Sequence, residues 1–114
     1  MGTTPTNRYR MGNAGDPKMD DVPIKMPNPH IDTFTDVNGD VWVRAGTGGV
    51  STWDTPNAGL RGKAWLIPSG TVYSDRLRAW SDSPGHWIWE PVDDMLLREF
   101  QADLAAVNAV AQPV

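Results

Sequence analysis

Glycine and proline interrupt this chain at short intervals. Its 114 residues include 11 Gly and 10 Pro, together with 6 Trp. Gly and Pro end helices and strands, whereas each Trp buries a large apolar area. We therefore expect a compact, turn-rich sheet held together by a few aromatic side chains. A chain of this length forms one small domain of modest stability, and we expect a single domain over residues 1–114.

The composition also excludes several classes of function. The chain carries 10 Lys and Arg against 14 Asp and Glu, a formal charge of −4, which makes binding to nucleic acid unfavourable. It has no cysteine, so disulfides, thiolate metal sites and cysteine nucleophiles are excluded. The two histidines, His30 and His86, have no partner at helical spacing, so we expect no metal site.

We expect no contact with a membrane. The longest apolar run is only a few residues, and residues 1–10 lack the apolar centre of a secretory signal. These features predict a protein made and folded in the cytoplasm.

The chain divides into a Pro-rich first third, a strand-rich centre and a C-terminal helix. Residues 16–30 contain four prolines and are expected to cross the surface without regular hydrogen bonding. Asn38-Gly39 predicts a turn, and Asp82–Gly85 predicts a hairpin turn. Strand composition predicts strands over residues 6–11, 40–44, 50–53, 64–67, 76–80 and 86–90.

A helix is expected over residues 94–109. Asp93 or Asp94 would supply the N-cap carboxylate. Four apolar residues then recur at spacings of three and four and predict the buried stripe of an amphipathic helix: Leu97, Phe100, Leu104 and Val107. The expected fold class is therefore α+β, with the sheet predominating.

The segment from Gly46 to Thr52 contains the first candidate site. Its glycines would let the backbone approach a ligand closely, as phosphate loops do, although the Gly-Lys-Ser/Thr of a P-loop is missing. A tight turn is the simpler interpretation. Ser51 and Thr52 alternate along a strand, so only one of them can face a cleft while the other faces the core.

The strand over residues 86–90 contains the second candidate site. Trp87 and Trp89 share one face, which predicts that this face is the core, so His86 and Glu90 would point toward solvent or a cleft. An ordinary surface histidine is the alternative. Arg10 and Arg44 carry guanidinium groups that would suit a pyrophosphate, but surface arginines are common.

Several motifs follow one another in fixed order through the centre of the chain. They are TGGVSTWD at 47–54, WLIPSGT at 65–71, DRL at 75–77, HWIWEP at 86–91 and Met95. In this order they resemble the Tse-two family of type VI secretion effector toxins, which are similar in fold to ADP-ribosyltransferases. The agreement in spacing extends from Asn38 to about Leu104. Tyr9-Arg10 further resembles a Tyr-Arg pair on the first strand of that family.

The resemblance implies an ADP-ribosyltransferase-like fold and NAD as the cofactor. It implies Ser51 as the functional hydroxyl, His86 as the functional histidine, and Arg10 as an anchor for cofactor phosphate or ribose. Glu90, on the His86 face, is the nearest candidate for a catalytic acid. The cofactor-binding prediction is completed by Gly48, Gly49, Thr52 and Trp53.

The chain also departs from the family pattern. Val50 stands where the family has Thr, so either one hydroxyl suffices or Thr52 substitutes for the second. The Pro-rich residues 16–30 replace a longer helical segment. Trp53 beside Ser51 and Trp87 beside His86 are candidates for the walls of a cleft.

The resemblance implies a toxin that acts in the bacterial cytosol, either modifying an unknown target with NAD or consuming NAD. A cognate immunity or antitoxin protein would neutralise it, set against Arg10, Arg44 and Arg61. A non-catalytic toxin or a protein-binding module on the same fold is the alternative. A structural adaptor that uses its Trp side chains as an interaction surface is a third class.

Overall fold

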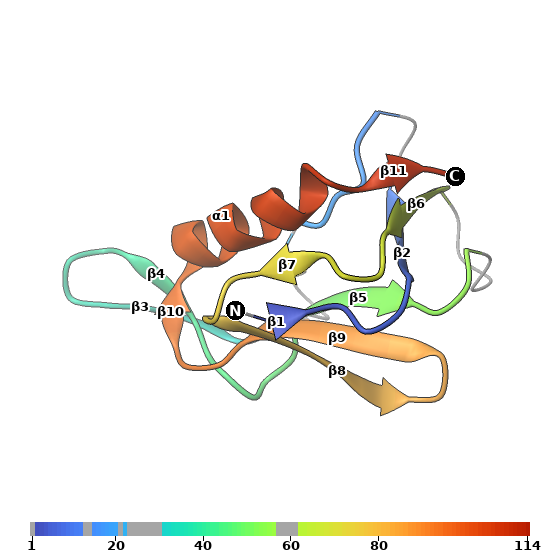
Figure 1. The fold of residues 1–114 in the computed structure, drawn as a ribbon. Coiled ribbons are helices and arrows are strands. Elements are labelled where there is room, and N and C mark those ends of the chain that lie inside the picture. The colour runs from blue at the N-terminus through green and yellow to red at the C-terminus, as the bar shows by residue number, and fades with distance from the viewer. Residues whose placement is uncertain (1, 13–14, 21, 23–30, 57–61) are drawn as a thin grey trace.

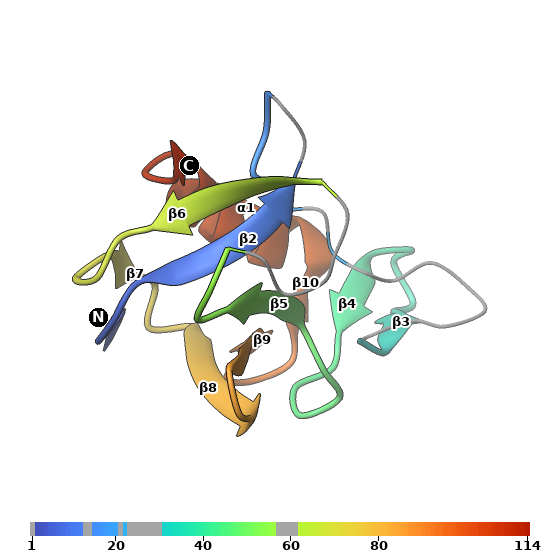
Figure 2. The same cartoon turned by 90° about the vertical axis from the view of Figure 1, so that its right-hand side faces the viewer.

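A six-stranded antiparallel sheet forms the body of the molecule (Figures 1 and 2). The computed structural model describes residues 2–12, 15–20, 22, 31–56 and 62–114. The strands follow one another in space as β11 (Gln112–Pro113), β6 (Lys63–Ile67), β2 (Arg8–Gly12), β5 (Val50–Trp53), β9 (His86–Pro91) and β8 (Leu77–Ser83).

Two smaller sheets flank this body. One is the pair β1 (Gly2–Thr3) and β7 (Val72–Tyr73). The other places β4 (Val41–Val43) between β3 (Thr33–Thr35) and β10 (Met95–Leu96). Figure 1 shows the β3–β4 hairpin projecting from one end of the molecule.

The tip of this hairpin contains the predicted Asn38-Gly39 turn. Gly39 has a φ of +83°, a backbone conformation that glycine adopts without strain. The carboxylate of Asp36 accepts hydrogen bonds from the backbone amides of Asn38 and Asp40, at 2.9 and 3.0 Å. The predicted turn is confirmed, and the hydrogen bonds to the Asp36 carboxylate stabilise it.

Helix α1 (Leu97–Asn108) lies along one face of the sheet, beside β7 (Figure 1). Phe100, Leu104 and Val107 are fully buried, as the apolar stripe predicted, and Leu97 packs partly buried against the same core. The expected fold class, α+β with a predominant sheet and a C-terminal helix, is confirmed.

The predicted start of the helix was wrong. Residues 95–96 pair with β4 as a strand, so the helix begins three residues later than expected. Neither Asp93 nor Asp94 caps it: the N-cap position is Leu96, without a side-chain hydrogen bond. The carboxylate of Asp94 instead accepts the backbone amide of Ala45 at 2.8 Å and ties the two segments together.

The core contains fewer tryptophans than the composition indicated. All six lie among the described residues, and Trp89 alone is fully buried, with the ring of Tyr73 edge-on at 5.0 Å. Aliphatic and methionine side chains fill most of the remaining core. Its fully buried members include Met19, Ile31, Val43, Val50 and Ile67.

The strands predicted from composition are present; the one over residues 50–53 has the predicted ends, and the others have shifted ends. The longest extension is in β8, which runs to Ser83 before the hairpin turn at Pro84-Gly85. Five short strands were not predicted, because two or three residues carry no periodic signal. They are β1, β3, β7, β10 and β11.

The described part of the Pro-rich segment, residues 16–20 and 22, contributes to the core, which the sequence did not predict. Met19 is fully buried, and its backbone amide donates to the side-chain oxygen of Asn108 at 2.9 Å. The amide nitrogen of Asn108 in turn donates to the carboxylate of Asp16 at 3.1 Å. Residues 21 and 23–30, including His30, lie outside the described residues. In the described part of the chain, no helix is long and apolar enough to cross a membrane.

Candidate functional site

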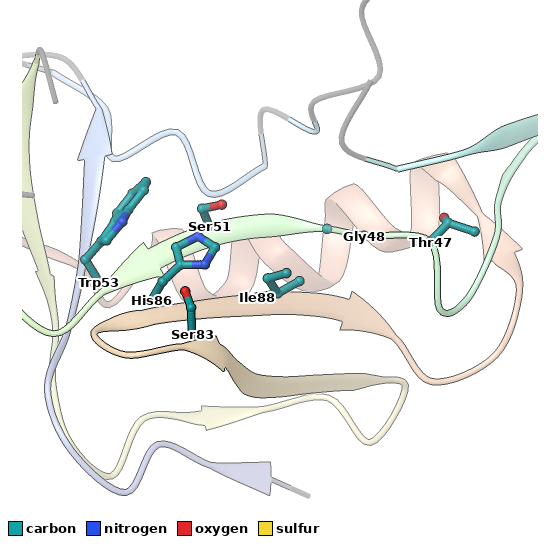
Figure 3. A pocket seen from close by; sticks show the side chains of 8 residues that line it. Thr47, Gly48, Ser51, Trp53, Ser83, His86 and Ile88 are labelled. Carbon is teal, nitrogen blue, oxygen red and sulfur yellow. The ribbon is translucent and has the colours of Figure 1, made fainter. Parts of the chain in front are cut away.

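A cavity of about 660 Å³ lies over one face of β5 and β9 (Figure 3). Its volume falls in the range of sites that bind small molecules and cofactors. It is lined by Thr47, Gly48, Gly49, Ser51, Trp53, Ser83, His86 and Ile88. The cavity therefore brings together five of the eight predicted site residues, from two segments more than thirty residues apart.

Strand pairing explains this convergence. In the antiparallel register of β5 and β9, Ser51 lies opposite Ile88 and Trp53 lies opposite His86. Residues directly opposite each other point to the same face of a sheet. The alternation therefore places Ser51, Trp53 and His86 together on the cavity side, as Figure 3 shows.

Thr52 was predicted to bind the cofactor, but it lies on the opposite face. Its side chain is fully buried, and its hydroxyl accepts a hydrogen bond from the indole nitrogen of Trp89 at 2.9 Å. Val50 shares this face and is also fully buried. Of the two neighbouring hydroxyls, Ser51 faces the cavity and Thr52 faces the core.

The imidazole of His86 sits at the wall of the cavity between an aromatic ring and a carboxylate. Its ring centroid lies 5.4 Å from that of Trp53, and the planes are tilted by 50°. Its Nδ1 lies 2.5 Å from Oδ1 of Asp82. The hydrogen bond with His86 lowers the pKa of the Asp82 carboxyl below its usual value. The sequence indicated Asp82 only as a turn residue, because a contact across a hairpin bulge has no sequence spacing of its own.

The glycine loop lines the cavity, and the fold itself requires it. A side chain at Gly49 would come within 2.0 Å of the backbone oxygen of Trp89, and Gly48 has a φ of +137°. The hydroxyl of Thr47 donates to the backbone oxygen of Arg44 at 2.8 Å and accepts from the amide of Asp32. These contacts support the simpler interpretation, a tight turn, whose backbone also forms one end of the cavity.

Glu90 was predicted to share a cleft with His86, but it does not reach this cavity. Its side chain is 3% exposed, and its Oε1 accepts a hydrogen bond from Nε of Arg78 at 2.5 Å. It lines a separate, smaller cavity of about 260 Å³ with Arg78 and the Ala45–Gly46 turn. The two residues share a strand face, but the end of β9 that carries Glu90 lies beside that turn, so the carboxylate is covered.

Arg10 was predicted to anchor a cofactor phosphate. Its guanidinium donates to the backbone oxygen of Ser51 at 2.9 Å and to that of Lys18 at 3.0 Å. Arg10 does not line the cavity, but it holds the strand that carries Ser51. Arg44 stacks over the ring of Phe34 at 4.2 Å, and Arg61 lies outside the described residues.

Arg8 is a structural arginine that the sequence did not distinguish from its neighbours. It is 1% exposed, and its guanidinium carbon lies 3.6 Å from the ring centroid of Trp87. The carboxylate of Asp54 accepts from both Arg8, at 3.5 Å, and the indole nitrogen of Trp87, at 2.9 Å. Trp87, predicted as a wall of the cleft, therefore packs on the far side of the sheet.

Among the described residues, those that line the cavity include no carboxylate, lysine or arginine. Within the described residues, no three His, Asp or Glu side chains gather into a group that could hold a metal ion. These residues offer the hydroxyls of Thr47, Ser51 and Ser83, an imidazole backed by a carboxylate, an indole wall and the backbone groups of the glycine loop.

Comparisons with protein-family models, curated proteins and solved structures gave no match to this chain.

Proposed function

We propose that the cavity binds NAD and that the protein is a toxin acting in the bacterial cytosol. The observation that carries the proposal is the convergence of Ser51, Trp53 and His86 on one cavity. These are three of the positions at which the motifs resemble the Tse-two family. An ADP-ribosyltransferase-like fold is part of the same proposal.

The reaction proposed is ADP-ribosyl transfer or NAD hydrolysis. The bond between the nicotinamide nitrogen and ribose C1′ breaks, and nicotinamide leaves with the bonding electrons. A target side chain or water then bonds to C1′ and releases a proton. Such a step passes through an oxocarbenium-like centre, so rate depends on holding the ribose and stabilising charge.

Five of the eight residues that line the cavity have a role in this proposal. The indole of Trp53 offers an apolar wall for a flat ring. The hydroxyl of Ser51 and the imidazole of His86 hydrogen-bond the ribose. The backbone of Gly48 and Gly49, which lines the cavity, lies close to the ligand.

The position of Glu90 favours a second candidate function. With this carboxylate bound to Arg78 outside the cavity, the described lining residues include no acid placed to act on the ligand. A non-catalytic toxin or a protein-binding module would need none. In both cases a cytosolic toxin requires a cognate immunity protein in the cell that makes it, and we propose such a partner.

Expression in a bacterial cytosol tests the proposal. We expect the native chain to arrest growth and Ser51→Ala and His86→Ala to relieve the arrest. Ser69→Ala is the matched control for Ser51, because Ser69 is exposed in the turn after β6. His30→Ala is the control for the second histidine. Harmless expression of the native chain would overturn the toxin proposal.

Purified protein then separates the two candidate functions. The NAD proposal expects saturable NAD binding and either release of nicotinamide or transfer of label from NAD to a lysate protein. Ser51→Ala and His86→Ala should lose this activity. Growth arrest by a chain that neither binds NAD nor transfers label would favour the non-catalytic alternative.

A further inference from the structure

The hairpin between β8 and β9 contains an irregularity next to the cavity. Ser81 pairs with Trp87 and Ser83 pairs with His86, so Asp82 is an extra residue on one strand only. This is a β-bulge, which bends the strand and redirects side chains. The extra residue places its carboxylate on Nδ1 of His86.

The turn sequence explains why the bulge is there. The connection is Pro84-Gly85, with Gly85 at a φ of +75°. Two-residue hairpins favour turns in which the first central residue has positive φ, and proline cannot adopt it. The bulge at Asp82 supplies the twist that the turn does not. The hairpin is closed further by the hydroxyl of Ser81, which donates to the backbone oxygens of Ser83 and His86 at 2.9 and 3.1 Å.

The contact determines which imidazole nitrogen carries the proton. An ionised carboxylate only accepts hydrogen bonds, so Nδ1 of His86 must be the donor to Asp82. The lowered pKa of Asp82 keeps that carboxyl ionised at neutral pH. In the neutral imidazole the second nitrogen, Nε2, is then an acceptor.

We propose that Asp82 is a positioning residue that holds His86 in the Nδ1–H tautomer, so that Nε2 accepts a hydrogen bond from a ligand hydroxyl. The proposal rests on the proposed function in taking His86 as the group that meets the ligand. The ligand group that meets Nε2 of His86 is then a hydrogen-bond donor, such as a ribose hydroxyl, and not a phosphate oxygen. The aromatic contact with Trp53 fixes the other side of the ring.

If Asp82 had only a structural role, Asp82→Ala would disrupt the hairpin. Within the described residues, the Asp82 carboxylate also accepts a long hydrogen bond from the hydroxyl of Ser83, at 3.4 Å. The backbone pairs and Ser81 hold the hairpin without it. We therefore expect Asp82→Ala to fold with an intact hairpin and to change the imidazole.

Nitrogen-15 NMR of the imidazole ring tests the proposal directly. The chain has two histidines, so His30→Gln leaves His86 as the single signal. At pH 8 we expect the Nδ1–H tautomer to predominate in this background. Asp82→Ala should shift the population toward Nε2–H, whereas Asp82→Asn, whose amide oxygen still accepts, should largely retain Nδ1–H. An unchanged tautomer in Asp82→Ala would overturn the proposal.

A second experiment measures the effect of Asp82 substitutions on growth arrest and NAD turnover. Asp82→Ala should lower potency or kcat/KM by about 10-fold, through kcat more than KM, with partial rescue in Asp82→Asn. Asp93→Ala serves as the control, because Asp93 is an exposed aspartate outside this hairpin and outside the cavity lining. Full activity of Asp82→Ala would also overturn the proposal. If the native chain does not bind NAD, the proposed cofactor fails, while the tautomer measurement still decides the role of Asp82.

Discussion

The indole nitrogen of Trp89 donates a hydrogen bond to the hydroxyl of Thr52 at 2.9 Å, and both side chains are fully buried. This bond joins β5 and β9 on the face opposite the cavity. It satisfies the polar atom of the largest side chain in the core. The same pairing of strands therefore supplies both the core bond and the cavity face.

We expect Thr52→Val to lower the free energy of unfolding by about 1–3 kcal/mol, because the buried indole N–H loses its acceptor while side-chain shape is retained. Urea denaturation measures the loss. In a Trp89→Phe background the same substitution should cost much less, because the donor is gone. Equal costs in the two backgrounds would show that the bond contributes nothing.

Gly49→Ala should prevent or severely weaken folding. The new Cβ would lie 2.0 Å from the backbone oxygen of Trp89, and two paired strands cannot separate without losing their ladder. We expect a loss of roughly 3 kcal/mol or more. Gly39→Ala is the matched control: its φ is positive, but nothing lies within 4 Å, so about 1–2 kcal/mol is expected. Thermal unfolding of both variants should preserve this order.

We expect the effects of substituting Arg78 and Glu90 on stability to be non-additive, because the two side chains form an ion pair. Arg78→Ala leaves a carboxylate that is 3% exposed without its main partner, and we expect a loss of about 2–3 kcal/mol. Adding Glu90→Gln should recover part of that loss, because the buried charge is removed. A double variant that is less stable than Arg78→Ala would contradict this account.

Glu90→Gln alone tests the predicted role of Glu90 as a catalytic acid. We expect growth arrest by this variant to persist.

Stability should fall in acid. Hydrogen bonds to the ionised carboxylate lower the pKa of three aspartates. The pKa of Asp16 is lowered by the backbone amide of Lys18 and, to a smaller extent, by the side chain of Asn108. The pKa of Asp36 is lowered mainly by the indole of Trp42, and that of Asp82 mainly by His86. A folded-state pKa below the unfolded value stabilises the fold above the unfolded pKa, about 4, and this contribution is lost as pH falls through the folded pKa values.

Substitution of Asp16 isolates one part of this dependence. Asp16→Ala should be less stable than the native chain at pH 7, and the difference should shrink as the pH is lowered below about 4. Asn108→Ala should reduce the same pH-dependent difference only in part, because the amide of Lys18 still binds the carboxylate. Denaturation curves across this pH range measure both. A difference that grows in acid would reverse the sign of the argument.

Arg8 and Asp54 form an ion pair but differ in burial, so we expect their substitutions to lower the stability by different amounts. Arg8→Ala removes a buried guanidinium from the face of Trp87 and should cost about 2 kcal/mol. Asp54→Ala should cost less through its ion pair with Arg8, because the aspartate is 48% exposed and solvent screens the pair. Chemical denaturation of the two variants measures the contrast, which would be refuted if Asp54→Ala were the more damaging.

The sequence by itself determined the pieces with local signals. The apolar stripe of Phe100, Leu104 and Val107 identified the helix, and Asn38-Gly39 identified its turn, because periodicity and turn chemistry depend on near neighbours. Alternation along β5 predicted that only one of Ser51 and Thr52 faces a cleft. Motif order suggested that Ser51 and His86 belong to one site.

Tertiary structure decided everything that depends on which strands become neighbours. The register of β5 against β9 selected Ser51 over Thr52 for the cavity. Pairing of residues 95–96 with β4 moved the helix start away from Asp94. A bulge brought Asp82 to His86, and Arg78 covered Glu90. Burial and hydrogen bonding across strands act between residues distant in sequence, so no local pattern encodes them.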